Sequence, residues 1–179
     1  AEDATQFGAL VTQVNSQALP TTGIRQRAFC GSIDTEANAQ TIAVGVNAAR
    51  AEIVWGEKLD WTPAELAADA AALYALGEAA GITGMQCNWD SLGLGPNTLD
   101  TLWTVPYPRS GTTPTRTVIK GALNNGLTPI GINASGKTYL VSRITTRSLT
   151  NSISDYRIRD AHKVTICDFY GDDVQAKVA

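Results

Sequence analysis

The chain has 179 residues, of which 44% are hydrophobic and 17% are charged, so it is long enough to bury a core as one domain. A net charge of −3 with scattered basic residues disfavours a nucleic-acid partner or an anionic membrane. Three widely spaced cysteines and one histidine disfavour a zinc site or a disulfide framework, so we expect reduced thiols, and no apolar run reaches the roughly eighteen residues of a membrane helix.

The first elements in chain order are a helix and a strand. Apolar residues recur at helical spacing over residues 2–18, which predicts a helix whose inner stripe is Phe7, Leu10, Val11 and Val14. A proline and a glycine follow and break this pattern. Residues 27–31 are then expected to form a short buried strand.

A second helix and a second strand follow. Asp34 or Thr35 is the expected cap of a helix that runs to about Arg50, with an inner face of Ala39, Ile42, Val46 and Ala49. Residues 51–55 are predicted to form the next strand. This strand contains the first of the four tryptophans, Trp55, which we expect to pack in the core.

The strongest local signal for a helix start is a capping box. Thr62 supplies the cap, Pro63 the first helical position and Glu65 the returning carboxylate, so a helix is predicted to run from here to about Ala80. Residues 81–113 have no convincing period and form a long irregular connection. Connections of this length are usually functional or interaction segments.

The last third is predicted to contain a helix, a hairpin and a final helix. A helix should start at Pro114 and end near Asn124. Two strands, over 127–133 and 138–147, should pair as an antiparallel hairpin, and residues 155–179 show a helical stripe. Together these elements predict a single α/β domain over 1–179, with a three-layer mixed sheet flanked by helices and the hairpin near the C-terminal part.

The turn of that hairpin matches a phosphate-loop pattern. GINASGKT begins at Gly131, ends at Thr138 and satisfies G-x-x-x-x-G-K-[ST]. That chemistry requires a helix after the loop, whose N-terminal amides hold the phosphates. The residues after Lys137 are mostly β-branched or aromatic and predict a strand instead. A nucleotide-binding protein that uses this loop stays as the alternative hypothesis.

No assembled catalytic site is evident in the sequence. The single histidine, His162, falls on the inner stripe of the final helix, and no G-x-S-x-G elbow is present. Cys30 and Cys167 lie in apolar runs and are expected to be small core residues. We therefore expect no enzyme activity, no cofactor and no metal.

Several short pieces of the sequence follow one another in a characteristic order and spacing: Leu123-Asn124-Asn125-Gly126, Thr128-Pro129-Ile130, Gly136-Lys137, Arg143-Ile144-Thr145-Thr146-Arg147-Ser148, and then 155–165. Further matching pieces lie upstream, at 27–32, 51–55 and 62–68. In this order the chain resembles the sheath protein of contractile phage tails, in particular the Mu-like group. The likeness covers most of residues 25–179.

This resemblance implies a Rossmann-like or subtilisin-like core, where the words describe fold alone. It also implies a structural subunit of the virion tail that assembles in the host cytoplasm, polymerises with other copies of itself around a tail tube protein, and contracts during genome delivery. A related phage-tail-like particle stays open. Members of the family carry an N-terminal arm and a C-terminal region that this chain is expected to lack, so we expect a monomer or weak oligomer in solution.

Interface candidates follow from the chemistry of contacts that break and form again. Large amphipathic rings dominate contact energies, and surface ion pairs are individually weak, at about 0–1 kcal/mol. The candidates for subunit contacts are Trp89, Trp103, Arg143, Arg147, Arg157 and Arg159. For the arginines, the alternative is that they are ordinary solvated charges.

Overall fold

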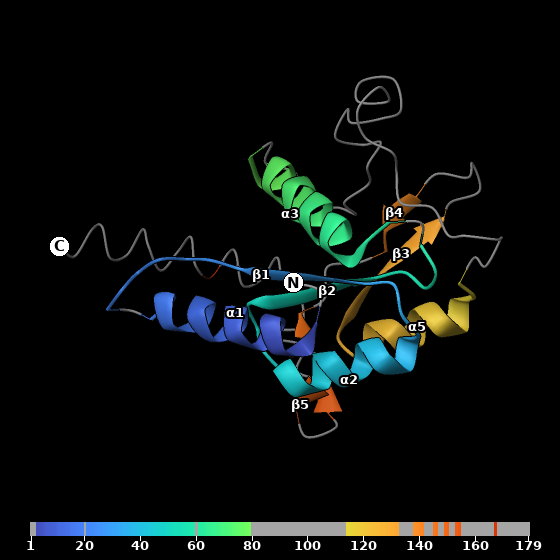
Figure 1. Ribbon diagram of the computed structural model, residues 1–179, viewed down its shortest axis with the longest axis horizontal. Helices are drawn as coiled ribbons and strands as arrows, with labels where there is room; N and C mark the ends of the chain where they lie inside the picture. Colours follow the sequence, from blue (N-terminus) through green and yellow to red (C-terminus); the bar gives the residue numbers. More distant parts are fainter. Residues whose placement is uncertain are drawn as a thin grey trace.

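The structure is a computed structural model, and it describes residues 3–19, 21–59, 61–79, 114–132, 138–141, 145–146, 149–150, 153–154 and 167. Its central element is a four-stranded sheet with the order β1-β2-β3-β4 (Figure 1). The strands are β1 (Ala28–Ser32), β2 (Ala51–Trp55), β3 (Leu127–Ile132) and β4 (Thr138–Leu140). A separate two-stranded ribbon consists of β5 (Leu149–Thr150) and β6 (Ile153–Ser154).

The body of the sheet is parallel. β1 pairs with β2 along its whole length, and β2 pairs with β3 from Ile53 to Trp55. Only the short edge strand β4 runs antiparallel, through three residue pairs with β3. This corrects the prediction of a long antiparallel hairpin: the second strand was expected to extend over 138–147, but β4 ends at Leu140.

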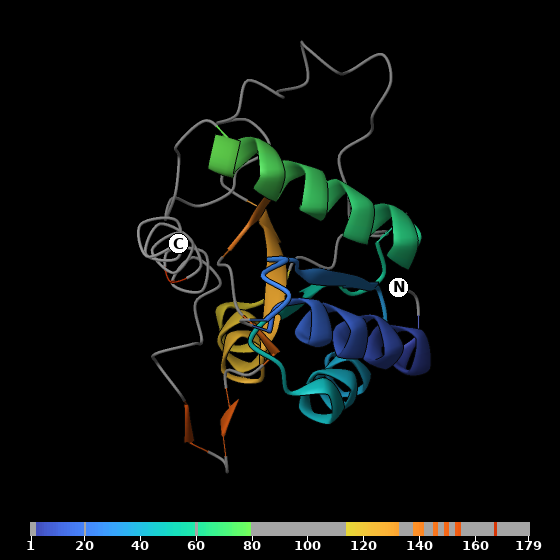
Figure 2. The same cartoon turned by 90° about the vertical axis from the view of Figure 1, so that its left-hand side faces the viewer.

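Helices cover both faces of the sheet (Figure 2). On one face lie α1 (Ala4–Gln17), α2 (Glu36–Val46) and α5 (Arg116–Asn124), which contact β1, β2 and β3, respectively. On the other face α3 (Pro63–Ala79) crosses β1 and β2. The prediction of an α/β fold is therefore confirmed for the described residues.

The alternation of side chains along β2 produces two separate cores. Ile53 and Trp55 point toward α1, α2 and α5, whereas Val54 packs with Leu66 and Tyr74 on the α3 face. All five residues of β2 are buried, as expected for a central parallel strand. The prediction that Trp55 is a core residue is confirmed, since none of its surface is exposed.

Local sequence signals explain where the helices start. The capping box of α3 is formed as predicted: the Thr62 amide donates to Glu65 Oε2 at 2.8 Å and the Glu65 amide donates to Thr62 Oγ1 at 3.3 Å. Thr35 caps α2, and Thr115 caps α5, so Pro114 precedes the cap instead of occupying the first helical position as predicted.

The end of α2 also differs from the prediction. The helix ends at Val46, four residues before the expected Arg50, because Asn47 adopts a left-handed conformation with φ of 40°. Asparagine tolerates this conformation better than most residues do, so it is a recognised helix terminator.

Within the residues that the structure describes, no helix is long and apolar enough to span a bilayer.

Candidate functional site

The carboxyl edge of the sheet is the usual ligand-binding region of open α/β folds. In open α/β sheets, ligands bind where adjacent strands send their connections to opposite faces. Here that point lies between β1, which leads to α2, and β2, which leads to α3. The two loops are joined by backbone hydrogen bonds, from the Gly56 amide to the Ser32 carbonyl at 3.1 Å and from the Lys58 amide to the Ile33 carbonyl at 3.0 Å.

Close packing completes the closure of this edge. A Cβ atom at Gly31 would lie 1.9 Å from the carbonyl oxygen of Pro63, so the first turn of α3 rests directly on the backbone of β1. The indole Nε1 of Trp55 donates to the Asp34 carbonyl at 2.8 Å. These contacts bring the carboxyl ends of β1 and β2 and the start of α3 close together.

Two carboxyl groups near this edge have lowered pKa values. The pKa of Asp34 is lowered mainly by a hydrogen bond from the Asn38 side chain at 2.7 Å and then by the Thr35 amide. The pKa of Glu65 is lowered by the Thr62 amide and then by the Thr62 hydroxyl. Both causes are hydrogen bonds at helix starts, so these shifts have a structural explanation.

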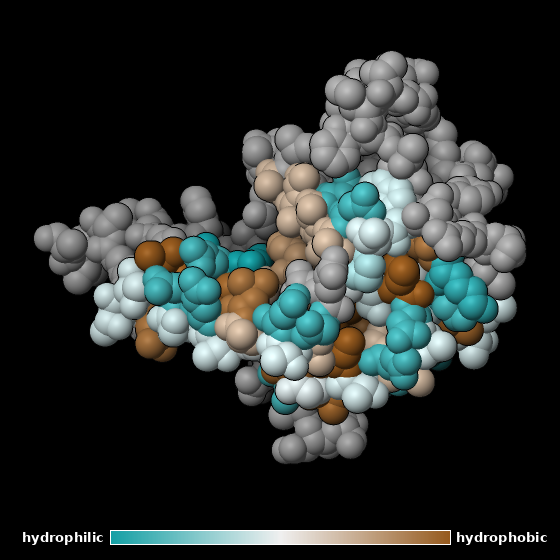
Figure 3. All heavy atoms as spheres, in the orientation of Figure 1, coloured by the Kyte–Doolittle hydropathy of each residue, from teal (hydrophilic) through white to brown (hydrophobic). Residues whose placement is uncertain are grey.

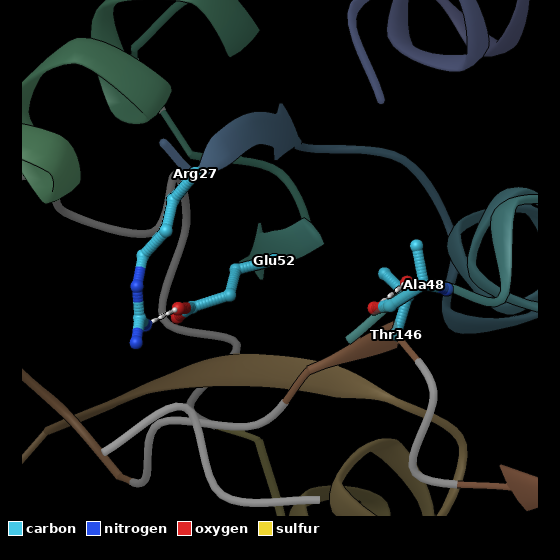
Figure 4. A network of polar contacts seen from close by, with 4 residues as sticks. All are labelled: Arg27, Ala48, Glu52 and Thr146. Atoms are coloured by element: carbon cyan, nitrogen blue, oxygen red, sulfur yellow. Dashed lines mark hydrogen bonds and ion pairs between the residues drawn. The ribbon is translucent and has the colours of Figure 1, made fainter. Parts of the chain in front are cut away.

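The amino end of β2 carries a buried polar network (Figure 4). Arg27 Nη1 lies 2.9 Å from Glu52 Oε1, and the side chains of this ion pair are 14% and 1% exposed, respectively. Next to it, Thr145 forms an isolated antiparallel bridge with Glu52. The pair joins the residue before β1 to the second residue of β2.

Thr146 extends this network to the connection between α2 and β2. Its Oγ1 accepts from the Ala48 amide at 3.0 Å and donates to the Ala48 carbonyl at the same distance. These residues lie 98 positions apart in sequence, and both are buried. The Thr146 hydroxyl therefore bonds both the amide and the carbonyl of Ala48, as a neighbouring strand backbone would do. Together with the bridge at Thr145, these bonds hold residues 145–146 beside the sheet.

A third feature is an open groove between α1 and α2. It has a volume of about 580 Å³ and is lined by small, polar and aliphatic residues, among them Gly8, Thr12, Thr41, Ile42, Gly45 and Val46.

Within the described part of the chain, no three His, Cys, Asp or Glu side chains gather in a way that would hold a metal ion.

The predicted interface residues are not described by the structure. Trp89, Trp103, Arg143, Arg147, Arg157 and Arg159 all fall outside the described ranges, as do His162 and Lys137. The two cysteines that were predicted to be core residues differ in their burial. Cys30 is buried as predicted, but Cys167 is exposed, so the prediction was wrong for Cys167. An apolar run alone did not distinguish a helix position facing solvent from one facing the core.

Sequence reasoning missed the Arg27–Glu52 pair, although a signal was present. Glu52 is a single charge inside an otherwise apolar strand, and a carboxylate in a fully buried strand requires a charged or hydrogen-bonding neighbour. Arg27, placed before the neighbouring parallel strand, was a candidate for that neighbour.

The phosphate-loop pattern can be compared with the structure at both ends. Gly131 lies in β3, and Thr138 is the first residue of β4, where it pairs with Ile132. The chain therefore leaves the loop as a strand, whereas phosphate binding of this kind uses the N-terminus of a helix. Comparisons with known proteins give no further guidance: no protein-family model matches the chain, and no curated protein matches it.

Proposed function

We propose that this chain is a structural subunit of a contractile tail sheath that polymerises around a tail tube and contracts during genome delivery. The proposal rests on the order of the sequence pieces that resemble sheath proteins. It is supported by the position of two of these pieces in the core: Thr128 is buried in β3, Thr145 forms a bridge with Glu52 of β2, and Thr146 is hydrogen-bonded to Ala48 in the α2–β2 connection. The pieces that carry the resemblance are thus used to build the domain.

The mechanical role demands a subunit that moves as a rigid block. β2 is buried along its whole length and is paired on both sides. Glu52 near its amino end pairs with Arg27, and Thr146 holds the preceding connection at Ala48. The contacts between the β1 and β2 ends and the start of α3 add to the rigidity of this edge. The partners proposed are other copies of the chain and a tail tube protein, and the finer fold proposed is the three-layer sheath core.

Negative-stain electron microscopy of the complete gene product at high concentration tests this proposal. Hollow sleeves of uniform diameter are the expected result, because sheath subunits assemble side by side around a central bore. A monodisperse particle that does not assemble at any concentration contradicts the proposal.

Charge reversal at the interface candidates sharpens the test. Arg143→Glu and Arg147→Glu should reduce the amount of sleeve, since like charges across a contact oppose it. Arg116→Glu, at an exposed position of α5, is the matched control and should leave assembly unchanged. Equal effects of all three substitutions would remove these arginines from the proposed contacts.

The alternative nucleotide-binding function has a separate test. If the pattern from Gly131 to Thr138 holds phosphates, Lys137→Ala should lower nucleotide affinity by orders of magnitude. A turn in a hairpin should tolerate the same change within about 0.5 kcal/mol of stability. Nucleotide titration monitored by calorimetry, together with a denaturation curve of the variant, separates the two outcomes.

A further inference from the structure

The turn between α5 and β3 contains Asn125-Gly126, the only Asn-Gly pair in the sequence. In such a pair the backbone nitrogen of the glycine attacks the side-chain amide carbon of the asparagine, because glycine has no side chain that blocks the approach. A succinimide ring forms, and the side-chain nitrogen leaves as ammonia with the proton that the backbone nitrogen gives up. One water molecule then opens the ring to aspartate or isoaspartate, so the reaction needs no other reagent.

The native conformation of Asn125 keeps the two reacting atoms apart. This residue follows the last turn of α5 with φ of −104° and ψ of 19°. A ψ near zero places the Gly126 nitrogen beside the backbone nitrogen of Asn125 and therefore away from its Cβ atom. The ring requires the Gly126 nitrogen on the side of Cβ, so it closes only after the peptide unit between the two residues has turned.

Hydrogen bonds at the end of α5 hold this conformation. The Asn125 amide donates to the Gly121 carbonyl at 3.1 Å and to the Ala122 carbonyl at 3.0 Å, and the side-chain Nδ2 donates to the Gly121 carbonyl at 2.9 Å. On the other flank, Gly126 is buried with φ of 79°, and Leu127 already pairs with β2. The nitrogen that must leave is thus itself bonded to the helix.

We propose that Asn125 is a self-modifying site, which the native fold protects and which reacts when the end of α5 separates from β3. Opening of this corner frees the side chain and allows the peptide unit to turn, so the population of the open form sets the rate. Water is at hand for the second step, because Asn124 is exposed and hydrophilic side chains lie on this side of the molecule (Figure 3).

The product does not restore the native end of α5. Aspartate has no donor for the Gly121 carbonyl, and its charge lies at the C-terminus of a helix, where the backbone carbonyls disfavour a negative charge. Isoaspartate also adds a carbon atom to the main chain between α5 and the Leu127–Ile53 pair. The reaction therefore makes a transient opening permanent, and this inference is independent of the proposed sheath function.

Peptide mapping by mass spectrometry tests the protection, with the native chain and the same chain in urea incubated side by side at mildly alkaline pH. The conversion of Asn125 should be about tenfold or more slower in the native chain, since a protected group reacts in proportion to the open population. Equal rates in the two samples overturn the proposal, and so does a lack of product at Asn125 in urea.

Two cap variants test whether the opening is local. Thr115→Ala removes the hydroxyl that accepts from the Val118 amide at 3.4 Å at the start of α5, and it should raise the native rate by roughly fivefold. Thr62→Ala is the matched control, because it removes the equivalent acceptor from α3 on the opposite face of the sheet. It should leave the rate near that of the wild type, and circular dichroism should show both variants folded.

Equal acceleration by Thr115→Ala and Thr62→Ala would mean that the reaction requires unfolding of the whole domain, which overturns a local opening. Asn125→Asp builds one product directly and should lower the midpoint of thermal unfolding at neutral pH, since it loses the bond to Gly121. A midpoint equal to that of the wild type would overturn the conclusion that the product does not restore the native end of α5.

Discussion

The two faces of the sheet are covered in different ways. On the three-helix side, formed by α1, α2 and α5, large side chains such as Phe7 and Trp55 fill the space between helices and sheet. On the α3 side, a single alanine-rich helix approaches so closely that Pro63 touches the backbone at Gly31. The α3 side also has a core of large side chains, including Leu66 and Tyr74, but at Gly31 the helix meets the strand backbone directly.

The outer surfaces of the two sides differ in their content of charged residues. α3 presents charged residues such as Glu65, which keep a helix surface hydrated, whereas α1 and α2 present threonine, glutamine, alanine and glycine. Charge on the surface discourages contact and its absence permits contact. The two sides of the sheet therefore differ both in their packing and in the charge of their outer helix surfaces.

The largest effect is expected from truncating the three-helix side. Trp55→Ala should lower the free energy of unfolding by about 4 kcal/mol, and Leu66→Ala, in the α3 core, by about 3 kcal/mol, because the tryptophan leaves the larger cavity. Trp55 also loses its hydrogen bond to Asp34. Guanidinium denaturation measures both free energies of unfolding. If Trp55→Ala does not fold, the milder variant Trp55→Phe replaces it. A larger loss for Leu66→Ala would reverse the ranking of the two sides.

A pH effect of roughly 2–3 kcal/mol is expected from Cys30 on the three-helix side. Burial raises the pKa of this thiol from its ordinary value of 9.0 to about 11; the N-terminal amine lowers this pKa and Asp3 raises it, each by a smaller amount. A raised pKa in the folded state means that the stabilisation is present below pH 9 and is lost as the pH rises through about 11.

Denaturation curves at pH 8 to 11 should therefore diverge between the wild type and Cys30→Ala, whose stability lacks this contribution. Parallel curves would contradict the expected burial of the thiol. Thiol labelling gives a second readout, because the exposed Cys167 should react in the folded protein while Cys30 reacts only after unfolding.

The tie between Thr146 and the α2–β2 connection should contribute about 1–2 kcal/mol. Thr146→Val keeps the shape but removes the hydroxyl, so the buried Ala48 amide loses the acceptor that it has in the folded chain. Thr146→Ser keeps the hydroxyl and is the control. Thermal or chemical denaturation should place Thr146→Ser clearly above Thr146→Val, and equal stabilities would mean that water replaces the bond.

The sequence predicted the elements that depend on local chemistry. Apolar spacing identified α1, the run of β-branched and aromatic residues identified β2, and the pattern around Thr62 identified the start of α3. These signals are local because a cap or a helical stripe lies within a few residues. The errors lie where local signals compete: Asn47 ends α2 early through its left-handed conformation, although the helical pattern continues past it.

Contacts between distant segments were not predictable in the same way. The pairing of Arg27 with Glu52 and of Thr146 with Ala48 depends on strand order and register, which a single sequence does not specify. The α1–α2 groove depends on how two helices pack side by side on the sheet. The absence of charged residues from α1 was nevertheless visible in the sequence.

The smallest effect is expected at the start of α3, on the other side of the sheet. Thr62→Ala removes the hydroxyl that accepts from the Glu65 amide and should cost about 1 kcal/mol, whereas Thr62→Ser should keep the cap. Equal stabilities of Thr62→Ala and Thr62→Ser would contradict a contribution from this cap.

The same capping box should show a pH dependence, because hydrogen bonds from Thr62 lower the pKa of Glu65 below its ordinary value of 4.5. A lowered pKa means that this stabilisation is present above pH 4.5 and is lost as the pH falls through the folded-state value. Glu65→Gln retains the box without the titration, so its stability curve should lack this acid-side loss.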